Sequence, residues 1–390
     1  MSKDYKPFEI YLKQTMFPAD AELSFEEISE GNINHIYRAK DIASGRSVIL
    51  KQAEYVSRIS LDICLNTDRG KREAAYFDLF AAQMPGSVPQ VFAYDEAQRL
   101  IVMQDLKSCP VLRKAMLAEQ KSSHLGKQLG AFVAKTTAAT SDFCLLHPEK
   151  RKMQQPFSNP ELCDLTEKLV LTDPFVGAKE NGVCAENAAF LERQIYQNAL
   201  LRQRAAELKY RFMNQTQALV HGDLHFGSVF LNGDTPVIFD PEFCFFGPIG
   251  FDLGNLLAHF LMETLYARVR GGDASFELWL RKMTAQMLRS FEKEFRAAVK
   301  MGCTDAVLLN ERFLDSFIAS VFADTAGFAG AECLRRTIGI AKIPEFDLLK
   351  SAQRVQFERK IMNAGVQLME HMHSLNSADA LLSMIEKNSN

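Results

Sequence analysis

The spacing of apolar residues divides this chain into a strand-rich part and a helix-rich part with one strand-rich interruption. Residues 25–105 form short alternating runs separated by turn residues, with helical spacing only over residues 68–84. Residues 219–254 return to short strand-like runs. The helical segments after residue 106 are residues 124–143, 186–214, 255–269, 275–299, 310–336 and 346–375.

This division predicts an α+β protein with two lobes. A small antiparallel sheet with one helix occupies residues 1–106, and a larger, mainly helical lobe occupies residues 107–390. Clefts between lobes are favoured ligand sites, so we expect the functional residues to line such a cleft.

The bulk properties exclude several classes of protein. The 390 residues are 47% hydrophobic and carry a formal net charge of −3 with both signs mixed, which is unlike the basic patch of a nucleic-acid binder. No segment reads as a membrane span, and the polar start of the chain does not resemble a signal peptide. The eight cysteines are scattered without a C-x-x-C pair, which indicates free thiols in a cytoplasmic protein.

The strand-rich interruption places two aspartates at the ends of apolar runs. Its sequence is LVHGDLHFGSVFLNGDTPVIFDPEFCFFGPIGFDLG, and Asp223 follows the first run. A carboxylate on a loop held by a strand could accept a proton from a substrate hydroxyl. The alternative is a carboxylate that only caps the following turn.

The second aspartate opens the sequence Asp240-Pro241-Glu242. Two carboxylates spaced by a rigid proline can hold a hard cation such as Mg²⁺, although such a tripeptide can also be a plain surface turn. A base and a metal site at neighbouring strand ends are what phosphoryl transfer requires. We therefore expect the carboxylates of Asp223 and Asp240 to converge on one nucleotide.

The first lobe offers partners for a nucleotide. Residues 29–34 form a turn with a single glycine, in which Asn34 could offer its amide to a phosphate. Lys51 ends an apolar strand and could contact the phosphates, and Glu73 on the next helix could orient it. The alternatives are a solvated lysine of an edge strand and an ordinary surface glutamate.

Two further segments complete the hypothesis. LIVMQDLK links the lobes, and the backbone of Gln104, Asp105 and Leu106 could bind the edge of an adenine. Arg335 and Arg336 follow an apolar helix and could bind anionic oxygens through their forked donors. Alternatively, they are a cationic helix end that faces solvent.

The motifs together resemble one known family. HGD-x-H-x-G-S, D-P-E-F and G-P-I-G-F-D-x-G are similar to the 5-methylthioribose kinases of the aminoglycoside-phosphotransferase and choline-kinase group. G-N-x-N, I-L-K-Q-A, D-R-x-x-x-E and M-x-D-L precede them, and G-F-x-G-x-E-x-x-R-R-x-I-G follows at residues 327–339. The wider group usually has Asn five positions after the catalytic aspartate, whereas Ser228 stands here, as in methylthioribose kinases.

The resemblance implies a protein-kinase-like fold and an enzyme that uses ATP and Mg²⁺. Its substrate would be a small sugar, 5-methylthioribose, which becomes 5-methylthioribose 1-phosphate in methionine salvage. Family members are often dimers, so the resemblance is also compatible with a homodimer.

The resemblance also implies roles for single residues. Asp223 would be the catalytic base, and Arg335 and Arg336 would face the substrate and the transferred phosphoryl group. His221 would support the catalytic loop and Asp252 would fix it by hydrogen bonds. The residues implied to contact ATP are Asn34, Lys51, Gln104, Asp105, Leu106, Asp240, Pro241 and Glu242. The residues implied to hold the metal are Asp240, Glu242 and Ser228.

Two departures from the family pattern concern the substrate. The family carries a tryptophan after the strand lysine, but residues 57–70 have none, and the only tryptophan is Trp279. Phe226 stands where the family usually has Thr or Ser, and we expect its ring to occupy space near the acceptor hydroxyl. These departures leave open a kinase for another pentose or small alcohol. A non-catalytic nucleotide-binding homologue is a further alternative. The retained residues that argue against it are Asp223, Asp240, Glu242 and Lys51.

Overall fold

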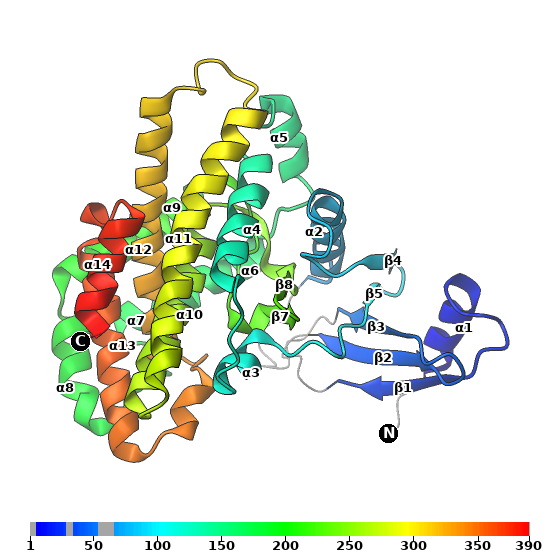
Figure 1. Cartoon of the computed structure of the whole chain (residues 1–390), viewed down its shortest axis with the longest axis horizontal. Coiled ribbons are helices and arrows are strands. Elements are labelled where there is room, and N and C mark those ends of the chain that lie inside the picture. Colours follow the sequence, from blue (N-terminus) through cyan, green and yellow to red (C-terminus); the bar gives the residue numbers. More distant parts are fainter. Residues whose placement is uncertain (1–4, 29–33, 54–65, 390) are drawn as a thin grey trace. The chain divides into compact units, whose positions relative to one another are not determined.

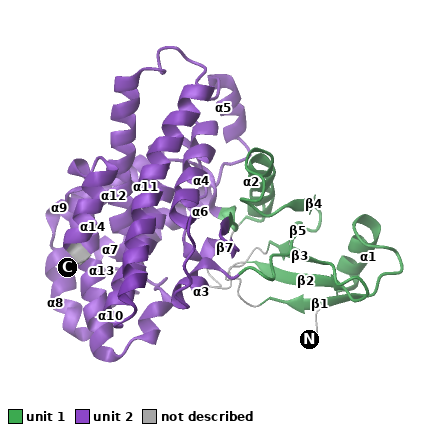
Figure 2. Cartoon of the chain, in the orientation of Figure 1, with its two compact units in different colours: residues 1–109, 237–242 green, residues 110–236, 243–390 purple. Residues whose placement is uncertain are grey.

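The chain folds into two compact units. The computed structural model describes residues 5–28, 34–53 and 66–389 (Figure 1). The first unit comprises Met1–Cys109 and Val237–Glu242, and the second comprises Pro110–Pro236 and Phe243–Asn390 (Figure 2). The expected boundary at residue 106 lies close to the observed one. Residues 237–242, however, group with the sheet unit, where the Ile238 amide donates to the Ser87 carbonyl at 2.8 Å.

The first unit is built on a five-stranded antiparallel sheet. Its strands follow the order β1-β2-β3-β5-β4. They are β1 (Leu23–Glu27), β2 (His35–Asp41), β3 (Ser47–Gln52), β4 (Val91–Asp95) and β5 (Leu100–Gln104). The predicted helix is α2 (Arg69–Gln83), and a further helix, α1 (Lys6–Thr15), was not predicted. The predicted combination of sheet and helix is confirmed.

The core of the sheet unit follows from the alternation of its strands. Tyr37, Leu50 and Val102 are fully buried on the face that also covers Phe8 and Leu12 of α1. Lys51 follows Leu50 on the central strand β3, so its side chain points to the opposite face of the sheet. Its register partners are Ile36 and Ile101. The alternation that builds the core thus directs this lysine to the other face of the sheet.

The second unit is mainly helical. Its α-helices are α3 (Leu112–Leu117), α4 (Leu125–Ala139), α5 (His147–Gln154), α6 (Pro160–Leu171), α7 (Asp173–Val176), α8 (Ala188–Leu191), α9 (Ala199–Asn214), α10 (Ile249–Val269), α11 (Ala274–Gly302), α12 (Glu311–Ile338), α13 (Ser351–Glu370) and α14 (Ala378–Ser389). Its short helical turns are η1 (Ala185–Asn187), η2 (Glu192–Tyr196), η3 (Phe226–Ser228), η4 (Pro241–Phe243), η5 (Pro344–Leu348) and η6 (Met372–Ser374). The chain crosses between the units within η4 and within β8.

Short strands interrupt the helices where the sequence predicts them. β6 (Ala218–Val220) pairs antiparallel with β9 (Phe245–Gly247). β7 (Val229–Asn232) and β8 (Thr235–Ile238) form a second two-stranded ribbon. Asp223 and Asp240 therefore each follow the end of a short strand, β6 and β8.

One predicted helix is wrong as a continuous element. Residues 186–214 divide into η1, α8, the π-helical turn η2 and α9. The break falls at Asn198, whose side chain accepts a hydrogen bond from the Leu201 amide at 3.0 Å and so caps α9. The asparagine competes with the backbone for this donor and ends the preceding helical turn.

α12 is a long helix that is largely covered by its neighbours. Within the described residues it is the one helix long and apolar enough to cross a membrane, but 83% of that stretch is buried. Neighbours on several sides explain this composition, because a helix that is apolar all round belongs in a protein core. Its last turn carries Arg335 and Arg336.

Candidate active site

A buried lysine joins two carboxylates in the first unit. The Lys51 ammonium lies 2.7 and 2.9 Å from the two carboxylate oxygens of Glu73 and also contacts Asp240. Burial by itself would lower the pKa of Lys51, but the surrounding carboxylates outweigh it and raise that pKa. The lysine is therefore a fixed, oriented cation and not a solvated edge residue.

Asp240 is the accessible carboxylate of this group. Its side chain is 42% exposed, whereas that of Glu73 is 2% exposed. Its backbone φ is 65°, which is rare for a residue with a Cβ and rarer before a proline. Strained backbone of this kind is concentrated at functional sites.

Glu242 and Asn34 form a second cluster, which is buried. The Asn34 amide donates to Glu242 at 2.8 Å, and the Asn34 side-chain oxygen accepts two bonds from Arg69. Arg69 also lies 3.3 Å from Glu242. Asn34 thus holds an arginine and a glutamate together, while the rest of the expected phosphate loop, residues 29–33, lies outside the described residues.

Carboxylates crowd at this end of the first unit. Burial raises the pKa of Glu73 to about 8, and Asp240 and Glu242 add to the shift while Lys51 opposes it. Burial and the Asp240 charge raise the pKa of Glu242 as well. A divalent cation would relieve this repulsion, so the donor set fits Mg²⁺, which binds through one or two carboxylates and otherwise through waters and phosphates. Within the described residues no cluster of three or more metal-ligating side chains occurs.

The expected adenine-binding segment is partly committed to other bonds. The Gln104 amide donates to the Gln90 carbonyl at 2.8 Å, so this donor is not free for a base. The Asp105 carboxylate accepts from Arg38 at 2.7 Å and from Ser47 at 2.6 Å. Asp105 therefore anchors β2 and β3 to the end of β5, and Leu106 is buried beside it.

In the second unit, backbone hydrogen bonds fix the loop after β6. The amides of His221 and Gly222 donate to the Asp252 carboxylate at 2.6 and 3.0 Å. Gly222 has a φ of +83°, and a Cβ there would lie 2.2 Å from the Phe243 carbonyl oxygen. His221 is fully buried and accepts the Asp223 amide at 3.3 Å. His221 and Asp252 thus both contact the backbone of the loop that carries Asp223.

Two arginines and one histidine surround the carboxylate of Asp223. One carboxylate oxygen lies 3.1 Å from Arg335 and 3.8 Å from Arg336, and the other lies 3.4 Å from His225. Burial would raise the pKa of Asp223, but these neighbours hold it well below its usual range. Asp223 is therefore ionised at neutral pH and does not act as a turn cap.

The arginine pair does not face solvent. The side chains of Arg335 and Arg336 are 10% and 11% exposed, and both bind Glu332, one turn earlier on α12. The alternative of a solvated helix end is therefore wrong. The dipole of the helix C-terminus still favours these cations at this end.

Ser228 closes the loop that carries Asp223. Its hydroxyl accepts the His225 amide at 2.9 Å and donates to the Asp223 carbonyl at 3.0 Å. The side chain is buried, and its hydroxyl both donates and accepts within the loop. These two bonds hold the ends of the loop together, and the metal ligation implied for Ser228 stays a prediction.

Phe226 does not occupy the space that the sequence analysis expects. Its ring is 2% exposed and packs edge-to-face on Phe260 at 4.8 Å and against His259 at 5.6 Å. The expectation of a ring beside the acceptor hydroxyl is wrong, because the side chain turns into the core against α10. One reason for suspecting a different acceptor is thereby removed.

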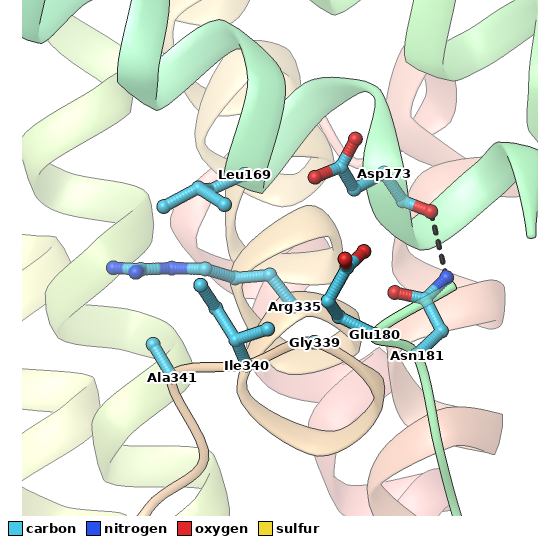
Figure 3. A pocket seen from close by; sticks show the side chains of 8 residues that line it. All are labelled: Leu169, Asp173, Glu180, Asn181, Arg335, Gly339, Ile340 and Ala341. Atoms are coloured by element: carbon cyan, nitrogen blue, oxygen red, sulfur yellow. Dashed lines mark hydrogen bonds between the residues drawn. The ribbon is translucent and has the colours of Figure 1, made fainter. Parts of the chain in front are cut away.

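A small pocket lies along the stem of Arg335 (Figure 3). In Figure 3 the Arg335 side chain runs between Leu169 and Ile340, and Asn181 donates to the Asp173 carbonyl at 2.7 Å. The remaining residues that line it are Glu180, Gly339 and Ala341. The space of about 10 Å³ is room for a single water and is too small for a sugar.

Sequence reasoning assigned no role to three residues at these sites. His225 stands two positions after Asp223. Glu332 precedes Arg335 by three positions and Arg336 by four, so it lies on the same helix face as both arginines. Arg69 lies four positions before Glu73 on α2 and contacts Asn34 and Glu242. The helical spacing could have indicated Glu332, whereas the Arg69 contacts join distant segments and carry no local signal.

Comparisons with known proteins show what this chain is similar to. Residues 24–281 match the phosphotransferase enzyme family. Methylthioribose kinase of Bacillus velezensis is 32% identical over 366 residues, which cover 93% of this chain and 91% of that protein. The enzyme of that name from Geobacillus thermodenitrificans is 32% identical over 96% of this chain and 94% of its own length. Choline kinase from Cryptosporidium parvum shares the fold, with a TM-score of 0.52 at 9% identity, covering 97% of this chain and all of that one.

Proposed function

The chain belongs to the methylthioribose kinases of the phosphotransferase enzyme family, and on this premise we propose that it transfers the γ-phosphoryl group of ATP to the 1-hydroxyl of 5-methylthioribose. One observation carries the proposal: Asp223 is ionised and held beside Arg335, Arg336 and His225 on a loop that Asp252 fixes. The products would be 5-methylthioribose 1-phosphate, ADP and a proton. The free cysteines of the described residues fit a reducing compartment, so we place the enzyme in the cytoplasm.

The first unit supplies the nucleotide side of the reaction. The Lys51 ammonium, oriented by Glu73, would bind phosphate oxygens of ATP and offset their charge. Asp240 is its exposed partner, and Glu242 stands two residues on. These two carboxylates would hold Mg²⁺, which supplies charge neutralisation at the phosphates when bound.

The second unit supplies the acceptor side. The Asp223 carboxylate would accept a hydrogen bond from the sugar hydroxyl and aim its oxygen at phosphorus. The new bond joins the sugar oxygen to the γ-phosphorus, and the bond from that phosphorus to the bridging oxygen breaks. Because the pKa of Asp223 is held low, the carboxylate is a weak base, so the proton moves to it late, after the sugar oxygen has begun to bond.

The cations around Asp223 have a second task. Arg335 and Arg336 carry forked donors that match the equatorial oxygens of a transferred phosphoryl group. Charge spreads over these oxygens in the transition state, and oriented cations stabilise it without reorganisation. His225 contributes a neutral donor: its Nδ1 accepts the Gly227 amide at 2.7 Å, which leaves the proton on Nε2, toward Asp223.

The test is a transfer assay with a matched pair of variants. Wild type should phosphorylate methylthioribose in preference to ribose, glucosamine and choline. Asp223→Asn should lose at least about 10³-fold in kcat while its Kd for ATP, measured by calorimetry, stays within about twofold. Asp324→Asn removes a carboxylate of the same unit that pairs with Arg211, and it should keep full turnover.

Three results would refute the proposal. Equal or faster turnover of another acceptor would reassign the substrate. Near-normal turnover of Asp223→Asn would remove the base. ATP binding without transfer to any acceptor would favour a non-catalytic homologue.

A further inference from the structure

One buried carboxylate binds both arginines of the site. Glu332 on α12 is 1% exposed. One of its oxygens accepts from Nε of Arg335 at 2.5 Å, and the other accepts from Nε of Arg336 at 2.8 Å. Each of the two carboxylate oxygens therefore accepts a hydrogen bond from a different guanidinium.

The helix sets this arrangement. Residues three and four positions apart lie next to each other on one face, so a glutamate at 332 reaches arginines at 335 and 336 without straining α12. Each guanidinium is planar and presents its donors in a fixed fork. Binding at Nε therefore sets where the terminal nitrogens point.

The terminal nitrogens of both arginines point to the same atom. Nη2 of Arg335 lies 3.1 Å from one Asp223 oxygen, and Nη2 of Arg336 lies 3.8 Å from the same oxygen. Two guanidinium groups this close repel each other, and burial strengthens that repulsion. A single carboxylate between them offsets it, as the pKa of Glu332 shows: burial would raise it, but the two arginines hold it well below its usual range.

The other described neighbour of Glu332, His259, does not carry a charge that could offset the repulsion between the two arginines. His259 lies 3.4 Å from Glu332, is 3% exposed, and burial lowers its pKa well below the usual value, so it is a neutral neighbour. Its ring packs against His225 at 5.4 Å and against Phe226. Within the described contacts, the charge that balances the arginines on the side away from Asp223 is therefore that of Glu332.

We propose that Glu332 is a positioning residue that holds Arg335 and Arg336 with their donors converging on the Asp223 oxygen and on the phosphoryl group beside it. The inference rests on the proposed function for its catalytic consequence and on the Nε contacts for its geometry. Glu332 touches neither substrate nor nucleotide in this scheme, and it acts only through the two arginines.

The test compares Glu332→Gln with a matched control. A glutamine has one acceptor oxygen, so it can serve one Nε and must turn its own N–H groups toward the other. We expect kcat to fall by about 10–100-fold with the Kd for ATP unchanged within about twofold. Glu358→Gln alters another fully buried glutamate of the second unit, which accepts from the amides of Cys184 and Asn187, and it should leave kcat unchanged.

A double-mutant cycle separates positioning from mere stability. If Glu332 acts through the arginines, adding Glu332→Gln to Arg335→Ala/Arg336→Ala should cause no further loss of kcat. An additional loss equal to that in the wild-type background would overturn the inference. So would a Glu332→Gln enzyme whose kcat matches that of Glu358→Gln.

A second measurement keeps the inference distinct from the function. The Nε–H protons of Arg335 and Arg336 should exchange slowly with solvent by ¹⁵N NMR in the wild type, and at least one should exchange faster in Glu332→Gln. If the wild type phosphorylates no acceptor, the proposed function fails and this exchange alone decides the geometry. Unchanged exchange of both protons would overturn the positioning role even in an active enzyme.

Discussion

Replacing Gly222 by alanine tests whether the backbone after β6 fixes the position of Asp223. A Cβ at this position would lie 2.2 Å from the Phe243 carbonyl oxygen, whereas ordinary contact begins at 3.4 Å. A close-packed interior cannot absorb this overlap, so the loop must move by about 1 Å. That movement would act directly on the neighbouring Asp223.

The structure allows the loss of stability to be worked out. The left-handed φ of +83° is unfavourable by about 1–2 kcal/mol for any residue with a Cβ. The movement also strains the bonds from the His221 and Gly222 amides to Asp252, and a hydrogen bond to a charged group contributes about 1.5–3 kcal/mol. We expect the free energy of unfolding to fall by at least about 3 kcal/mol and kcat to fall by about 10²-fold.

Gly271→Ala is the matched control. Gly271 also has a left-handed φ, of +73°, but nothing lies within 4 Å of a Cβ built there. Its substitution should lower stability by only about 1–2 kcal/mol and leave kcat unchanged. Urea unfolding of both variants, with kcat measured on the same preparations, makes the comparison. Equal stability losses in the two variants, with full turnover of Gly222→Ala, would refute the reasoning.

Two further predictions concern the charged residues of each unit. Lys51→Met removes the buried cation beside Glu73 and should lower kcat/KM for ATP by on the order of 10²-fold. The control, Lys150→Met, removes a buried lysine that pairs with Asp142 and should leave kcat/KM for ATP unchanged. Equal effects of the two substitutions in a steady-state assay would show that Lys51 has no role at the nucleotide. The pKa of Asp223 in the folded protein lies below its ordinary value of 3.8. The ionised carboxylate therefore stabilises the fold at pH values above 3.8, and this stabilisation is lost as the pH falls below 3.8. The difference in free energy of unfolding between wild type and Asp223→Asn, measured with urea, should therefore be constant from about pH 5 to 8 and become smaller below about pH 4. A difference that grows in acid would contradict the low pKa of Asp223.

Local patterns were sufficient for much of the fold. Strand alternation and turn residues predicted the sheet, and helical spacing predicted α2, α4, α11 and α12. The pattern failed at residues 186–214, where a single capping asparagine ends one helical segment and begins another. A side chain that competes for backbone donors leaves hydrophobic periodicity almost unchanged, so periodicity could not reveal the break.

The candidate site shows the same division. The pairing of Lys51 with Glu73 was foreseeable, because a strand lysine and an acidic residue on the next helix are close in sequence. The direction of the Phe226 ring was not, because the choice between solvent and core depends on α10. The hydrogen bonds of Asn34 to Arg69 and Glu242 could not be foreseen either, because they join segments far apart along the chain.

The amino-acid order by itself determined which chemical groups this chain owns and how they are spaced along each strand and helix: an aspartate after β6, a lysine on β3, and a glutamate with two arginines on one helix face. Only the tertiary structure decided their charge and orientation. The neighbours that folding brings together keep the carboxylate of Asp223 ionised, fix Lys51 and bind both arginines to Glu332. The physical reason is that spacing is a property of the local backbone, whereas desolvation and Coulomb interaction depend on every group that folding brings within a few ångströms.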